Sequence, residues 1–132
     1  MTPAQLAKIG TNTSEDDIAK IVLLGAALSH PLRIEIMKAT KLTEMSPVEV
    51  AATITGRGRL GSISYHFRWL ADNGLIKMTR IEPRRGALKH FYRLNQEFIE
   101  ELAEATRSCL DEGLVKLLAS DLNNDKPTTG RS

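Results

Sequence analysis

The fold is decided by residues 62–94, SISYHFRWLADNGLIKMTRIEPRRGALKHFYRL. Ile63, Phe67 and Leu70 stand at positions i, i+4 and i+7, the spacing of one apolar face on an α-helix. Gly74 follows them and favours the left-handed backbone conformation that ends many helices. The first part of the stretch therefore predicts a helix over about residues 62–73.

The second part of the stretch predicts a β-hairpin. Residues 75–82 alternate loosely between apolar and polar side chains, and residues 87–94 alternate more clearly. Between them, Pro83-Arg84-Arg85-Gly86 has the composition of a four-residue turn. A helix of about 10–12 Å diameter fits the major groove of DNA, and a basic hairpin beside it completes the outline of a winged helix-turn-helix.

The remainder of the chain predicts further helices. Ser14 is a helix cap before a first helix that ends at Ser29-His30-Pro31, where proline starts a second helix. Residues 41–45 are predicted as a loop, and Ser46-Pro47-Val48-Glu49 has the capping-box pattern of a third helix start. A long last helix is expected over residues 95–122.

The predicted fold class is mainly α, with about five helices and a small β-hairpin wing. We expect residues 1–13 to form a flexible arm, residues 14–94 the DNA-binding domain, residues 95–122 a C-terminal helix packed on that domain, and residues 123–132 a disordered tail.

Composition excludes several classes of protein. The chain has 132 residues, 42% of them hydrophobic, and contains no apolar run long enough to cross a membrane. The one cysteine, Cys109, cannot form an internal disulfide, and His30, His66 and His90 lack ligand spacing, so no metal and no cofactor are expected. Without a signal peptide, the expected location is the cytoplasm. The sequence contains no phosphate-binding loop and no nucleophile paired with a base, so no feature of it indicates an enzyme.

The net charge of +2 conceals an uneven distribution. Residues 55–94 contain nine lysines and arginines against two acidic residues, whereas residues 95–125 contain eight acidic residues against two basic ones. Phosphates are therefore attracted to the part of the chain that holds the predicted helix and wing. A charge run alone is usually a solvated face, but its coincidence with these elements favours nucleic acid as the partner.

Polar and basic side chains around the helix and the wing are the candidate DNA contacts, to base edges or to phosphates. Several residues of the helix also have a structural interpretation. Ser62 can cap the helix, Tyr65 and Trp69 can pack against the wing, and His66 can be a packing residue held by a hydrogen bond. The predicted DNA-binding residues are Arg57, Arg59, Ser62, Ser64, Tyr65, His66, Arg68, Arg80, Arg84, Arg85 and Lys89.

Three segments resemble the ArsR-type winged-helix repressors of bacteria and archaea. They are LSHPLRIEIM, SPVEVA, and SISYHFRWLADNGLI with the hairpin that ends in HFYRL. The resemblance implies a homodimer built from the first and last helices, bound to a palindromic operator and often released by a ligand. The dimer-interface residues that it suggests are Ile18, Ile21, Val22, Phe98, Leu102, Cys109, Leu110, Leu114 and Leu117.

The chain departs from many members of that family in lacking their metal ligands. It has no cysteine before Cys109 and no histidine after His90, so metal sensing is not expected. The residues fit a dimer switched by a small-molecule effector and a dimer without an effector equally well.

The sequence thus predicts a sequence-specific regulator of transcription that binds double-stranded DNA, with a homodimeric repressor as the form that the resemblance implies. The alternative is a winged helix used as a protein-interaction module in a larger complex, with Trp69, the acidic last helix and the two polar tails as contact surfaces.

Overall fold

The computed structural model describes residues 14–54, 60–111 and 119. These residues group into two compact units, one formed by Leu24–Glu100 and the other by the residues up to Leu23 together with those from Glu101 onward. In the described part of the chain, no helix combines the length and the apolar character that a membrane crossing requires.

The described residues form five helices and one hairpin, which confirms the predicted fold class. The elements are α2 (Glu15–Leu28), α3 (Pro31–Leu42), α4 (Pro47–Thr53), α5 (Leu60–Asp72), β1 (Ile76–Arg84), β2 (Ala87–Leu94) and α6 (Gln96–Cys109). The last predicted helix is described as far as Cys109, and its predicted continuation lies largely outside the described residues.

Local sequence signals begin the first helices as expected. The Ser14 hydroxyl accepts a hydrogen bond from the Asp17 N–H at 3.1 Å. At the start of α4 the capping box is complete, since Ser46 and Glu49 each accept a hydrogen bond from the backbone N–H of the other. The imidazole of His30 caps α3 by accepting from the Leu32 N–H at 3.1 Å.

The core of the Leu24–Glu100 unit forms around α5, which contacts α3, α4 and β1. The predicted apolar face of α5 is buried, with Ile63, Phe67 and Leu70 at most 1% exposed. They lie among the other buried side chains of the unit, which include Leu32, Ile36, Val50, Leu75, Ile76 and Phe91. Gly74 has φ +79° after the end of α5, the left-handed conformation expected of it.

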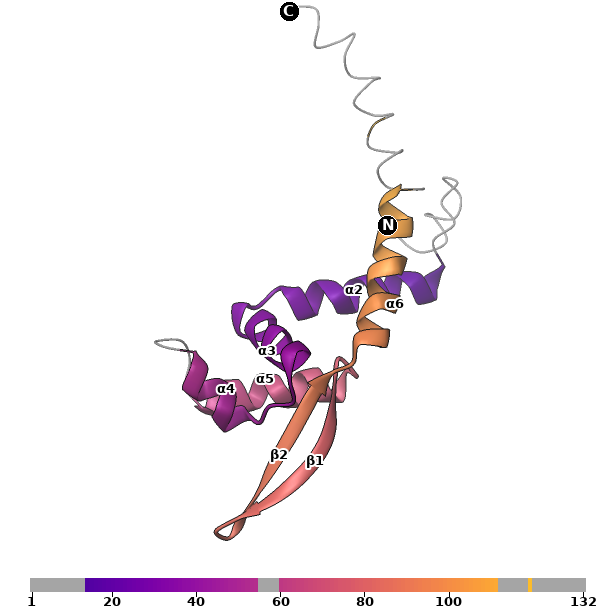
Figure 1. The fold of residues 1–132 in the computed structure, drawn as a ribbon. Helices are drawn as coiled ribbons and strands as arrows, with labels where there is room; N and C mark the ends of the chain where they lie inside the picture. Colours follow the sequence, from indigo (N-terminus) through magenta and orange to yellow (C-terminus); the bar gives the residue numbers. More distant parts are fainter. Residues whose placement is uncertain (1–13, 55–59, 112–118, 120–132) are drawn as a thin grey trace, which may run out of the picture. The chain divides into compact units, whose positions relative to one another are not determined.

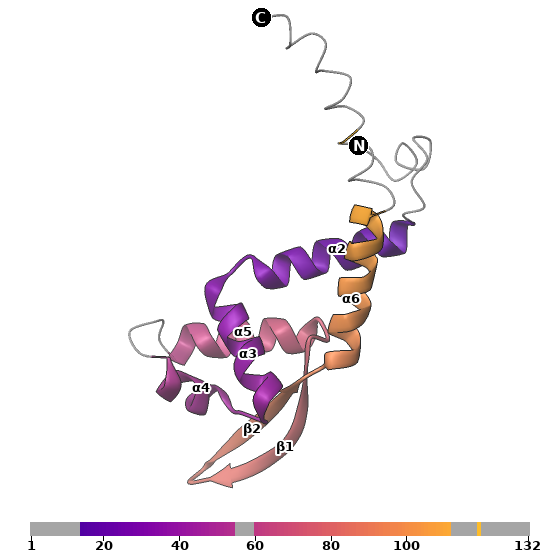
Figure 2. The same cartoon turned by 45° about the horizontal axis from the view of Figure 1, so that its top comes forward.

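Strands β1 and β2 form an antiparallel hairpin that projects from the helices of this unit, with its turn at the free end (Figure 1, Figure 2). Strand β2 has the expected bounds, but pairing continues to Arg84 and Ala87, so the turn contains only Arg85 and Gly86. The predicted four-residue turn was therefore wrong. Both turn residues have positive φ, 32° and 81°, which matches the right-handed twist of a hairpin.

Two further features differ from the sequence prediction. Helix α3 extends to Leu42, and Met45 pairs with Tyr92 through two backbone hydrogen bonds of 2.9 Å. The predicted loop over residues 41–45 therefore contains a helix end and an isolated β-bridge beside β2. In β1 the register shifts between Met78 and Arg80, which leaves Thr79 as a bulge and explains the weak alternation of this strand.

In the second unit, Lys20 of α2 forms ion pairs with Asp16 at 3.2 Å and with Glu101 of α6 at 3.0 Å. The hydrogen bonds to Glu101 and Asp16 raise the pKa of Lys20. Leu102 and Ala105 of α6 are buried, and Glu104 pairs with Arg107 on the outer side of the helix.

Candidate nucleic-acid interface

The outward side of α5 carries several of the predicted contact residues. Ser62 and Arg68 are exposed, Tyr65 is 53% exposed, and Ser64 is half-buried. Because α5 begins at Leu60, Ser62 lies within its first turn and does not cap the helix. Among the described residues, Arg68 has no ion pair or hydrogen bond that would occupy its guanidinium, so it is free to bind an anion.

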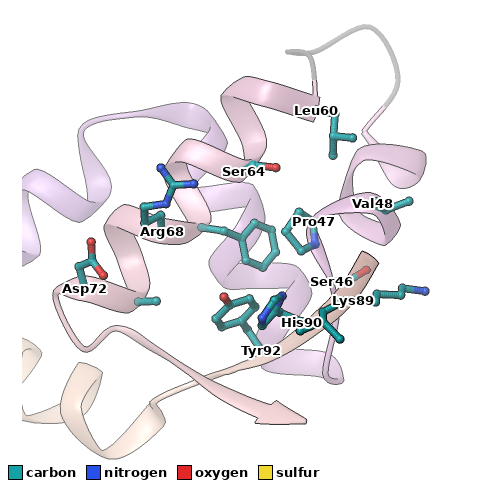
Figure 3. Close-up of a pocket in the computed structure, with 13 residues that line it drawn as sticks. Ser46, Pro47, Val48, Leu60, Ser64, Arg68, Asp72, Lys89, His90 and Tyr92 are labelled. Carbon is teal, nitrogen blue, oxygen red and sulfur yellow. The ribbon is translucent and has the colours of Figure 1, made fainter. Parts of the chain in front are cut away.

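A groove of about 450 Å³ lies between α4, α5 and β2 (Figure 3). Leu60, Ser64, Arg68 and Asp72 recur every four residues and line it along one side of α5. The other walls come from the start of α4 and from β2, with Ser46, Pro47, Val48, Leu88, Lys89, His90 and Tyr92. The groove therefore combines apolar walls with cationic side chains at its border.

The tip of the wing is basic and exposed. Arg84 ends β1, and Arg85 occupies the first position of the two-residue turn. Arg84 lies 3.5 Å from the carboxylate of Glu82, whereas Arg85 has no charged partner within the described part of the chain. Arg85 is thus the unpaired cation at the end of the hairpin.

The stem of the wing has its charges paired. Arg80 binds Glu44 at 2.5 Å and also Glu82, and its guanidinium lies 3.7 Å from the centre of the Phe91 ring. The hydrogen bonds to Glu44 and Glu82 raise the pKa of Arg80, and hydrogen bonds from Thr79 and Arg80 lower the pKa of Glu44. The hydrogen bond from Arg80 likewise lowers the pKa of Glu82.

The second predicted cation of the stem, Lys89, is also paired. Its ammonium group lies 3.5 Å from the carboxylate of Glu49, the residue that completes the α4 capping box. The Lys89 side chain is only 18% exposed. Sequence reasoning assigned Glu49 to helix capping alone and gave Glu44 no role, because their partners lie far away along the chain.

His66 does not fit the predicted DNA contact, because it lies on the buried side of α5 with 7% of its surface exposed. Its Nδ1 accepts a hydrogen bond from Arg33 Nε at 3.2 Å, and its ring lies 4.2 Å from that of His30. Burial lowers the pKa of His66, and the nearby His30 and Arg33 lower it further. His66 therefore packs α5 against the start of α3.

Arg33 organises this packing and was missed as a key residue, although it lies in a segment that carries the family resemblance. Besides His66 it binds the Ala26 carbonyl at 2.8 Å, and its guanidinium lies 3.7 Å above the Trp69 ring. Trp69 therefore contacts Arg33 of α3, which gives it a structural role within the domain.

The predicted dimer-interface residues differ in exposure. Val22 and Leu110 are 64% and 41% exposed, whereas Leu102 is fully buried within its own chain. The others in the described part, Ile18, Ile21, Phe98 and Cys109, are half-buried. Arg57, Arg59, Leu114 and Leu117 lie outside the described residues.

A metal centre is not formed by the described residues, none of which group as three or more histidine, cysteine, aspartate or glutamate side chains. This observation concerns residues 14–54 and 60–111 together with residue 119.

The fold is similar to that of several solved structures, while no family model and no curated protein matches the sequence. An ArsR-like transcriptional regulator from Rhodococcus sp. RHA1 matches with a TM-score of 0.58 and 19% identity, over 84% of this chain and 93% of that chain. A possible transcriptional regulator for arsenical resistance matches with a TM-score of 0.53 and 22% identity, over 72% and 92%. HlyU from Vibrio cholerae N16961 matches with a TM-score of 0.52 and 26% identity, over 70% and 95%.

The chain thus has a winged helix-turn-helix fold. Within that class its arrangement of helices and wing is of the ArsR type, as the sequence resemblance implied.

Proposed function

We propose that this chain is a sequence-specific regulator of transcription that binds double-stranded DNA. The observation that carries the proposal is the outward side of α5, where Ser62, Tyr65 and the unpaired Arg68 lie exposed on the helix beside a wing that ends in Arg84 and Arg85. Residues 14–94 are the proposed DNA-binding domain, and the protein acts without catalysis, in the cytoplasm.

In the proposed complex, α5 lies in the major groove and the wing lies on the adjacent minor groove or its phosphates. Hydroxyl groups of Ser62, Ser64 and Tyr65 suit base edges, which present donors and acceptors in the major groove. Arg68 suits either a guanine or a phosphate, because its planar guanidinium can donate two parallel hydrogen bonds. His66 is left out of this interface because it is buried.

The proposal is tested by fluorescence anisotropy with a labelled duplex from the region upstream of the protein's own gene and a scrambled duplex of equal length. Binding should favour the upstream duplex, and log affinity should fall linearly with log salt concentration because bound phosphates release counterions. Equal affinity for both duplexes would contradict sequence specificity at that fragment. Failure to bind either duplex would contradict the proposal and favour the protein-interaction module.

Two α5 variants identify the contact surface. Tyr65→Ala and Arg68→Ala should each weaken binding to the preferred duplex, by about 1–3 kcal/mol where a base contact is lost. Lys38→Ala is the charge-matched control, since it removes an exposed cation of α3 that lies outside both the proposed DNA interface and the proposed dimer interface. A loss in Lys38→Ala equal to that in Arg68→Ala would show that only net charge matters.

We also propose that the protein is a homodimeric repressor with a palindromic operator, in which α2 and the helix over residues 95–122 form the interface. The exposed apolar side chains Val22 and Leu110 on α2 and after α6 support this assignment. Two copies related by a two-fold axis would place two α5 helices on half-sites about one helical turn of DNA apart.

A further inference from the structure

We propose that the wing binds DNA through its tip only, by Arg85 with the adjoining Arg84, and that Arg80 and Lys89 are positioning residues. This inference rests on the proposed function, because it specifies how the wing contributes to DNA binding. Of the four wing cations predicted to contact DNA, it keeps only the two at the end of the hairpin as DNA contacts.

The two predicted cations of the wing stem are paired with carboxylates in the folded protein. Arg80 pairs with Glu44 and Glu82, and Lys89 pairs with Glu49, whereas Arg84 at the tip only shares Glu82 with Arg80, at 3.5 Å. Each exposed pair alone contributes little to stability, but paired carboxylates also repel a phosphate that approaches the same cation. Of the four predicted wing cations, only Arg85 is free of such a carboxylate within the described residues.

Arg80 is held most firmly because it has partners on several sides. Its Nε donates to Glu44, another guanidinium nitrogen donates to Glu82, and its plane lies over Phe91, a core residue that is 3% exposed. The hydroxyl of Thr79 donates a further hydrogen bond of 2.6 Å to Glu44. A phosphate would have to displace two carboxylates and draw the guanidinium away from the ring.

These contacts attach the wing to the helices beside it. Glu44 precedes Met45, whose backbone pairs with Tyr92, so the Glu44–Arg80 pair joins the segment before α4 to β1. The Glu49–Lys89 pair joins α4 to β2. Both cations therefore hold the wing in place relative to the helices of its unit. This fixes the position of the wing tip relative to α5.

Charge-matched variants distinguish positioning from DNA contact. Arg80→Gln/Glu44→Gln and Lys89→Gln/Glu49→Gln each remove one cation and its carboxylate, so the net charge is unchanged. Glutamine at position 49 can also retain the capping box. Arg85→Gln removes the tip cation, and circular dichroism confirms that each variant is folded before its affinity is measured.

The readout is anisotropy with the preferred duplex across a salt series. Arg85→Gln should lower the magnitude of the slope of log affinity against log salt by about 0.9, which corresponds to about an eightfold loss of affinity at 0.1 M salt relative to 1 M. Each double variant should retain the wild-type slope, with any loss of affinity the same at every salt concentration.

Two results would overturn the inference. One is a slope that falls in either double variant as much as in Arg85→Gln, because the removed cation would then contact a phosphate. The other is an unchanged slope in Arg85→Gln. A wild-type protein that binds no duplex would instead refute the proposed function itself, and it is recognised before any variant is compared.

Discussion

A cluster of four side chains joins the start of α3 to α5. Arg33 donates a hydrogen bond to His66 and lies over Trp69, and His30 lies against His66 while it caps α3. The hydrogen bond from Arg33 requires an unprotonated Nδ1 on His66, and a positive charge there would face Arg33 directly. The neutral form of His66 is therefore part of the folded structure.

Stability should depend on pH through this histidine. Burial, with His30 and Arg33 nearby, lowers the pKa of His66 below its ordinary value of 6.5, so the unfolded chain binds the proton first as pH falls. The contribution of neutral His66 is fully present above pH 6.5 and is lost as pH falls from there through the folded-state pKa, with a slope of at most about 1.4 kcal/mol per pH unit.

This dependence is measured by urea unfolding, followed by circular dichroism, at pH values between about 7.5 and 5. His66→Gln should flatten the curve in that range, because it removes the titrating ring. His90→Gln removes an imidazole from the wing without touching the cluster and should keep the wild-type curve. A His66→Gln curve as steep as the wild type would contradict the assignment.

At the scale of elements, the short helix α4 depends on its N-terminal cap. Ser46 is completely buried and accepts the Glu49 N–H, so Ser46→Ala leaves that N–H without its partner. The free energy of unfolding should fall by about 1–2 kcal/mol. Thr53→Ala removes a hydroxyl that donates to the Val50 carbonyl at 2.9 Å within the same helix, and because alanine has the higher helix propensity the net change should be less than about 0.5 kcal/mol. Equal losses in the two variants, measured by urea unfolding, would contradict a special role for the cap.

The elements that could be predicted from sequence are those with a strong local signal. The capping box at Ser46 and the apolar spacing in α5 act within a few residues, and both were confirmed. The bulge at Thr79 and the Met45–Tyr92 pairing were not predictable in this way, because they depend on which backbone lies opposite. The two-residue turn was missed because Pro83 suggested a turn position, whereas it pairs with Leu88 inside the hairpin.

At the scale of the whole molecule, dimerisation is the proposal with the greatest consequence for function. Val22→Glu places a charge on an apolar position of α2 that is 64% exposed, so the monomer should remain folded while the dimer dissociates. Sedimentation velocity should show a dimer for the wild type and a monomer for the variant, with affinity for a two-half-site duplex reduced by more than about tenfold. Lys38→Glu, an exposed change on α3 outside the proposed interface, is the control. A wild-type monomer would contradict the proposal.

The candidate site could be located from sequence more easily than its individual residues could be assigned. The excess of basic residues over positions 55–94 pointed to the α5 and wing surface, because net charge adds up whatever the detailed contacts are. It could not separate free arginines from paired ones. Arg80 meets Glu44 only after β1 folds back beside the segment before α4, across 36 positions of sequence. The sequence likewise could not show that His66 is buried against α3 and so is not exposed for a DNA contact.

The position of Trp69 has a practical consequence. It is the only tryptophan in the chain, and it lies on α5 beneath the guanidinium of Arg33. The indole emission of the unlabelled protein therefore originates from the helix proposed to read DNA. Its wavelength and intensity report the contact between α3 and α5 directly, so loosening of that contact can be followed by optical spectroscopy in real time without attaching a dye.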